Sequence, residues 1–192
     1  MLSRNWSRRV AAVALLLISI GLAAKASYIP AKALLAKGLI ENAWDRTLED
    51  GERHTPWSWA DHWPVARLTV PSQGIDKLIL NGAQGNSLAF APGAMTEFAQ
   101  PGTVGTAIVG GHRDTDFSFL KDLVLGDELR LQTATGEWQN YEVMAFDVVD
   151  GRNAHIETTS QGQSLLLVTC YPFDALVPGG PLRYVVSTRR VF

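Results

Sequence analysis

The chain has 192 residues, of which 46% are apolar and 19% charged, with a formal net charge of −2 and a single cysteine. One domain of ordinary size takes about 100–200 residues, so the length suits one domain with a short additional segment. The composition excludes a disordered chain, a disulfide-rich mini-protein and a strongly basic nucleic-acid-binding protein. The charge is uneven, because residues 1–46 carry seven basic and two acidic side chains whereas the rest of the chain is acidic.

The first segment is basic and then apolar. Arg4, Arg8 and Arg9 precede an uncharged apolar run over residues 10–24. Fifteen helical residues extend about 22 Å, which is less than the ~30 Å hydrocarbon core of a bilayer. A helix that continues to Ile29 is long enough to span it, provided that the lysine inside this stretch extends toward the headgroups.

A cleaved signal peptide is the alternative to a membrane anchor, because Ala24 and Ala26 fit a small-x-small cleavage site. In both interpretations the preceding arginines keep the N-terminus in the cytoplasm and place the body of the protein across the membrane. We therefore expect an anchor or signal segment over 1–29, a helical stalk and Trp-rich linker over 30–62, and the main domain over 63–192.

The segment between leader and main domain is predicted to be helical up to Asp50 and to end at Gly51. Trp57, Trp59 and Trp63 follow. Packing of this linker onto the domain is favoured over a membrane-interface belt. His54 and His62 lack partners at metal-binding spacing and are expected to be exposed.

From Val65 onward, short runs of β-forming residues alternate with turn signals rich in Gly, Pro and Asp. One short helix is expected around Phe117–Leu123. Eight strands with so little helix predict an all-β closed barrel or a sandwich. The predicted strands lie at 65–70, 75–80, 87–90, 105–110, 127–133, 138–149, 164–170 and 182–191.

The cysteine lies at the end of one of these strands. Leu165 to Val168 are apolar without interruption, which predicts a strand buried on both faces, and Cys170 ends it. Arg183 begins the next strand, so antiparallel pairing would make it a neighbour of the cysteine. A guanidinium there would favour a thiolate and could stabilise an oxyanion, although a surface ion pair is the commoner role of such an arginine.

A histidine is the second candidate for chemistry. His112 follows Gly110 and Gly111 at the end of a strand, on a loop that a rigid element holds. Nucleophilic cysteines need a nearby histidine to take up and return protons. His155, in contrast, lies in a polar loop without a supporting pattern.

Four segments carry a resemblance to the sortases, a family of membrane-anchored cysteine transpeptidases. Residues 107–113 (AIVGGHR) resemble the histidine motif, and residues 165–173 (LLLVTCYPF) resemble the Thr-x-Thr-Cys strand, with Leu167 at the first threonine. Residues 181–186 (PLRYVV) resemble the arginine strand, and residues 67–76 (RLTVPSQGID) resemble the opening strand and turn. The resemblance implies an eight-stranded closed sortase-type β-barrel with one or two short helices, preceded by an N-terminal membrane helix.

The resemblance also implies a reaction. Cys170 would attack a backbone carbonyl of an LPxTG-like C-terminal sorting signal and form a thioester, which an amine or water then resolves. His112 would act as general acid and base, Arg183 would bind the signal and stabilise the oxyanion, and Thr169 would help to shape the substrate groove. The motif CYPF and the short leader resemble the proteobacterial type, which acts on the periplasmic side of the inner membrane.

No cofactor, nucleic acid or metal is expected. Several acidic residues lie close in sequence, but their spacing does not match a calcium loop, so they are interpreted as a solvated face. These acidic residues are Asp114, Asp116, Asp122, Asp127 and Glu128.

The alternative function is a catalytically inert membrane-anchored β-domain that binds peptides or assembles envelope proteins.

Overall fold

A computed structural model describes residues 2–85, 87–153, 158, 162–175, 177 and 179–192, so the interpretation of His155 lies outside the described residues. The chain forms two compact units, Met1–Gly38 and Leu39–Phe192. The second unit therefore includes most of the segment that the sequence assigns to a stalk and linker.

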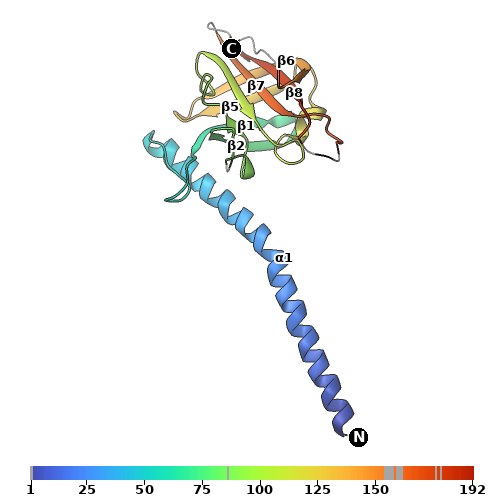
Figure 1. Ribbon diagram of the computed structural model, residues 1–192. Coiled ribbons are helices and arrows are strands. Elements are labelled where there is room, and N and C mark those ends of the chain that lie inside the picture. Colours follow the sequence, from blue (N-terminus) through green and yellow to red (C-terminus); the bar gives the residue numbers. More distant parts are fainter. Residues whose placement is uncertain (1, 86, 154–157, 159–161, 176, 178) are drawn as a thin grey trace. The chain divides into compact units, whose positions relative to one another are not determined.

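One long helix, α1 (Leu2–Asp50), runs through the first unit and into the second (Figure 1). From Arg8 onward it contains a stretch that is long and apolar enough to cross a membrane, judged by length and composition. The helix ends where Gly51 adopts a left-handed conformation (φ 75°) and its N–H donates to the Thr47 carbonyl oxygen at 2.9 Å. The predicted helix end at Gly51 is confirmed.

The eight strands of the second unit close into a barrel with the order β1-β2-β3-β4-β7-β8-β6-β5 (Figure 1). The predicted eight-stranded closed barrel is confirmed. The strands are β1 (Pro64–Val70), β2 (Ile75–Asn81), β3 (Gly93–Ala94), β4 (Gly105–Gly110), β5 (Glu128–Thr133), β6 (Trp138–Asp150), β7 (Gln163–Cys170) and β8 (Leu182–Val191).

The prediction of a strand at 87–90 was wrong. Residues Ser87–Ala89 form the 3-10 helix η2, and the third strand is the short β3 that follows it. The Ser87 hydroxyl donates to the carbonyl oxygens of Gly82 (2.7 Å) and Gln84 (2.8 Å), which closes a turn instead of extending the chain. The expected short helix is the 3-10 helix η3 (Ser118–Asp122), which follows a loop after β4.

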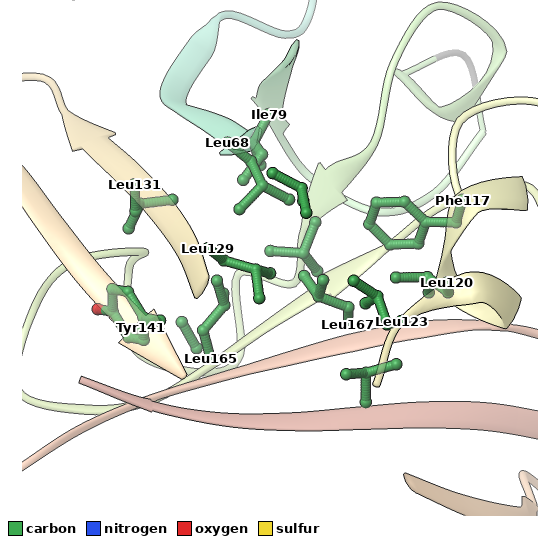
Figure 2. Close-up of a cluster of buried hydrophobic side chains, with 14 of the residues drawn as sticks. Leu68, Ile79, Phe117, Leu120, Leu123, Leu129, Leu131, Tyr141, Leu165 and Leu167 are labelled. Atoms are coloured by element: carbon green, nitrogen blue, oxygen red, sulfur yellow. The ribbon is translucent and has the colours of Figure 1, made fainter. Parts of the chain in front are cut away.

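Side chains from the inner face of the strands and from η3 fill the barrel (Figure 2). On β7, Leu165, Leu167 and Thr169 are buried, whereas the side chains that alternate with them, Leu166, Val168 and Cys170, are half-buried. The expectation of a strand buried on both faces was therefore wrong, because the outer face of β7 is incompletely covered. The largest fully buried side chains of this core are Leu68, Ile79, Phe117, Leu120, Leu129, Leu131, Tyr141, Leu165 and Leu167.

A second apolar cluster joins the end of α1 to the outside of the barrel. Ile40 and Trp44 are 3% and 0% exposed and pack in a cluster with Leu78, Leu80 and Ala91. The part of α1 after Gly38 thus belongs structurally to the barrel.

The Trp-rich linker packs against the same region, as predicted. The Trp57 ring lies edge-on to Phe90, with centroids 5.3 Å apart, and His62 stacks on Phe90 at 5.5 Å. The prediction that His62 is exposed was wrong, since it is only 2% exposed. Its ring is covered by these two aromatic neighbours, and its Nδ1 lies 2.9 Å from the Asp61 carboxylate.

A chain that begins at Gly51 should be less stable than one that begins at Leu39. Removing Ile40 and Trp44 uncovers Leu78 and Leu80, and the loss of two buried apolar side chains corresponds to about 3 kcal/mol or more of unfolding free energy. Urea unfolding of the two shortened chains measures this difference. Equal stability would mean that the helix end does not contribute to the barrel.

Candidate active site

Strands β7 and β8 pair antiparallel in a register that places Cys170 opposite Arg183. The Tyr171 N–H donates to the Leu182 carbonyl oxygen at 3.0 Å, so the 171–182 pair is hydrogen-bonded. Hydrogen-bonded and non-hydrogen-bonded pairs alternate along antiparallel strands. Cys170 and Arg183 are therefore a non-hydrogen-bonded pair, the type in which opposite side chains are closest.

Both residues point away from the barrel interior. Their neighbours Thr169 and Tyr184 face each other across the ladder, and Thr169 is buried within the barrel wall at 2% exposed. Because side chains alternate along a strand, Cys170 and Arg183 lie on the outer face, where both are half-buried. The thiol can therefore meet a reagent or a peptide from outside the barrel.

The loop after β4 brings His112 to the same end of the barrel. Strand β4 runs parallel to β7 with Gly110 opposite Val168, and the Gly111 N–H continues the ladder by donating to the Val168 carbonyl oxygen at 3.1 Å. His112 and Cys170 each lie two residues beyond this pair, His112 after β4 and Cys170 at the end of β7. The ends of β4 and β7 and the start of β8 thus bring His112, Cys170 and Arg183, the predicted candidates, together at one end of the barrel.

Gly111 is required by the core beneath the histidine. A Cβ atom at Gly111 would lie 2.7 Å from Cγ of the fully buried Phe117 ring, whereas a Cβ at Gly110 would meet only the Ala83 Cβ at 3.5 Å and the Met95 Cε at 4.0 Å. The absence of a side chain at 111 lets the Phe117 ring pack directly under the loop that carries His112.

Substituting these two glycines should therefore have unequal effects. Gly111→Ala forces its methyl group into Phe117 and is expected to lower the unfolding free energy by about 1–3 kcal/mol. Gly110→Ala is the matched control and should change it by much less. Chemical denaturation of both variants provides the comparison, and equal effects would contradict the packing argument.

Arg183 is held by backbone oxygens. Its Nη1 donates to the carbonyl oxygens of Gly180 (2.7 Å) and Leu182 (2.8 Å). Gly151 makes room for its stem, since a Cβ there would lie 3.2 Å from the Arg183 Cγ. Among the described residues no carboxylate forms an ion pair with Arg183.

Asp150, an acidic side chain whose charge interacts with Arg183, is paired with another arginine. Arg152 donates to Asp150 through its side chain and its backbone N–H, and these bonds, with a smaller effect from Arg183, hold the pKa of Asp150 at about 2. Asp150 therefore remains ionised and paired with Arg152 at neutral pH. Arg183 keeps its positive charge available for an anionic group.

Thr169 has a different environment from the exposed His112 and the half-buried Cys170 and Arg183. Its side chain is buried, and its hydroxyl donates to the Gly111 carbonyl oxygen at 2.7 Å. Thr169 thus joins the strand of Cys170 to the backbone next to His112. Any effect that it has on a substrate groove must act through this backbone.

Removing the Thr169 hydroxyl should weaken this connection. Thr169→Val leaves the Gly111 carbonyl without its donor and is expected to cost about 1 kcal/mol of unfolding free energy, whereas Thr169→Ser keeps the donor. Thermal unfolding of both variants distinguishes the two results. A valine variant as stable as the serine variant would show that the bond contributes nothing.

Sequence reasoning missed two features around this site. Arg113 is buried and bonds to the backbone after Cys170, which no sequence pattern indicates because its partners are carbonyl groups far along the chain. Tyr184 stacks on Tyr171 and Phe146 with centroids 6.1 and 6.0 Å apart, and Phe173 meets it edge-on. The aromatic residues in CYPF were a signal for this second feature.

The acidic residues near the site have local roles. Asp116 forms an ion pair with Lys77 at 3.1 Å, and the Asp127 carboxylate accepts a bond from the Val124 N–H at 2.9 Å. Within the described part of the chain, no three His, Cys, Asp or Glu side chains gather in a way that could hold a metal ion.

Comparison with protein families matches residues 68–191 to the sortase domain. The chain belongs to the sortase family. Sortase D of Bacillus subtilis (strain 168) is 33% identical over 125 residues, which cover 65% of this chain and 62% of that protein. The chain thus matches less than two thirds of the length of this sortase.

Solved sortase structures share the fold. A Clostridium perfringens sortase D5 transpeptidase aligns with a TM-score of 0.64 at 21% identity, covering 82% of this chain and 99% of that one. Sortase A from Corynebacterium diphtheriae aligns with a TM-score of 0.62 at 20% identity, covering 82% and 84%. These relatives come from Gram-positive bacteria, so the expectation of the proteobacterial type finds no support among them.

Proposed function

We propose that this sortase cleaves an LPxTG-like C-terminal sorting signal and transfers the acyl part of its substrate to an amine, or to water. The observation that carries the proposal is the ladder register that sets Cys170 opposite Arg183, beside the strand end that leads to His112. A cysteine, a base and an oxyanion donor on one accessible face are the groups that acyl transfer needs.

In the first step the Cys170 thiolate attacks the carbonyl carbon of the scissile peptide bond. The tetrahedral oxyanion collapses, the C–N bond breaks and His112 gives its proton to the leaving amine, which produces a thioester and a free C-terminal fragment. In the second step an incoming amine attacks the thioester and His112 accepts its proton. The C–S bond breaks and the thiolate is restored.

Arg183 has the oxyanion role in this proposal. Its guanidinium is not ion-paired among the described residues, and its Nη1 donates to two carbonyl oxygens. The absence of a side chain at Gly151 leaves room for its stem. A planar fork of donors can contact the oxyanion and the substrate backbone at the same time. The buried Thr169 supports the groove through the Gly111 carbonyl rather than by contacting the substrate.

The N-terminal helix would hold the enzyme at the cytoplasmic membrane. The arginines before the apolar stretch favour an N-terminus in the cytoplasm, and this supports a barrel on the extracytoplasmic side, where envelope proteins with sorting signals are accessible.

Intact mass spectrometry of the full-length protein in detergent, incubated with an LPxTG-type peptide, tests the proposal. The expected result is a thioester adduct that hydroxylamine or an added amine releases and that is absent from Cys170→Ala. Cysteine and alanine differ little in size at this half-buried strand end, so the variant should remain folded. An adduct that persists in Cys170→Ala would refute the assignment of the nucleophile.

Arg183→Lys should lower kcat/KM for thioester formation at least about tenfold, because a single ammonium cannot replace the planar fork. Arg130→Lys is a matched control, since Arg130 lies on β5 with half of its side chain exposed and pairs with Glu128. Steady-state kinetics with a fluorogenic peptide measure both. Equal rates in the two variants would remove Arg183 from the mechanism.

A further inference from the structure

Arg113, the residue after His112, has a buried guanidinium whose two terminal nitrogens contact different residues of a distant loop. Nη1 donates to the Pro172 carbonyl oxygen at 2.7 Å, and Nη2 donates to the Ala175 carbonyl oxygen at 2.6 Å. Its side chain is only 8% exposed. Both acceptors lie in the connection between β7 and β8, directly after the nucleophile strand.

The carbonyl oxygens of Pro172 and Ala175 are the main hydrogen-bond partners of the guanidinium. The nearby Asp114 is 72% exposed and lies 3.3 Å from Nε, so it neutralises the charge only weakly. Hydrogen bonds from a charged donor are stronger than neutral ones, and a buried charge without partners is costly. The arginine therefore fixes the separation between its own loop and the loop that begins at Tyr171.

The hydrogen bond from Arg113 to Pro172 and the hydrogen bond from Thr169 to Gly111 join the same two segments of the chain. Thr169, one residue before Cys170, donates to the carbonyl oxygen of Gly111, one residue before His112. Arg113, one residue after His112, donates to the carbonyl oxygen of Pro172, two residues after Cys170. One hydrogen bond thus joins the residues just before His112 and Cys170, and the other joins residues just after them.

We propose that Arg113 is a positioning residue that sets the place of the His112 imidazole relative to the Cys170 thiol, by joining the two loops on which the pair depends. The inference rests on the proposed function in that it assigns these two residues to one reaction. Arg113 itself faces backbone carbonyls and does not contact the substrate in this proposal.

The functional consequence follows from the geometry of proton transfer. A base must lie within hydrogen-bond reach of the group whose proton it moves, and displacing reacting groups by about 1 Å can cost roughly 100-fold in rate. The Phe117 N–H, which donates to the His112 carbonyl oxygen at 2.9 Å, holds the histidine backbone to its own loop. Among the described residues, the Arg113 and Thr169 side chains are the ones whose hydrogen bonds join that loop to the chain next to the cysteine.

The test compares Arg113→Ala in two backgrounds, the wild type and His112→Ala, using full-length protein in detergent. The first readout is the pH profile of Cys170 alkylation by iodoacetamide, and the second is kcat/KM for an LPxTG-type peptide, both normalised to titrated folded thiol. In the wild-type background, we expect alkylation at pH 7 to slow roughly tenfold and kcat/KM to fall roughly 10- to 100-fold. In the His112→Ala background, we expect less than about a twofold further effect on alkylation.

Three controls keep the result interpretable. Asp114→Ala removes the exposed carboxylate and should match the wild type. Arg130→Ala removes an arginine remote from the candidate site and should also match it. Arg113→Lys keeps the charge but cannot reach both carbonyls in the same geometry, so it should reproduce the loss even if Arg113→Ala fails to fold.

The inference is overturned if Arg113→Lys and Arg113→Ala retain wild-type alkylation, if their effect is the same in both backgrounds, or if His112→Ala itself leaves alkylation unchanged. Failure of the proposed function has a different signature. A wild-type protein that forms no thioester with any sorting peptide would refute the transpeptidase proposal, while the alkylation comparison would still decide the role of Arg113.

Discussion

The site depends on one physical constraint, the hydrogen-bond register that joins β4, β7 and β8. Because side chains alternate along a strand, a shift of one residue would move Cys170 into the barrel and separate it from Arg183. The buried inner residues oppose such a shift, since Leu165 and Leu167 would then leave the core. The packing of the barrel and the geometry of the site are therefore specified by the same alternation.

The sequence predicted the features that arise from local patterns. Most strand positions and the Cys170–Arg183 pairing follow from β-forming runs and from the turn signals between them. These patterns left a closed barrel or a sandwich open, and the resemblance to the sortases implied the closed barrel. The strand predicted at 87–90 failed because the Ser87 hydroxyl closes a turn by bonding two carbonyls, and this bond leaves no pattern in hydrophobicity. The prediction that His62 is exposed failed for a similar reason, since its burial depends on contacts with Trp57 and Phe90.

Long-range contacts account for what could not be predicted. The bonds of Arg113 span 59 and 62 residues, and the contact between the end of α1 and β2 joins a predicted stalk to the barrel. In both cases the decisive partner is a backbone group or a surface that exists only after folding. Arg113 was consequently found from the structure and not from a motif, whereas the motif around the nucleophile had already indicated Thr169.

Disulfide trapping of the β7–β8 register tests the central claim most directly. In Arg183→Cys, the new thiol and Cys170 form a non-hydrogen-bonded cross-strand pair, a spacing that a disulfide can bridge. In the control Tyr184→Cys, the new side chain faces the barrel interior. Under mild oxidation and intact mass spectrometry, the account predicts an internal disulfide in Arg183→Cys and none in Tyr184→Cys. The opposite result would show that the register, and with it the site, is wrong.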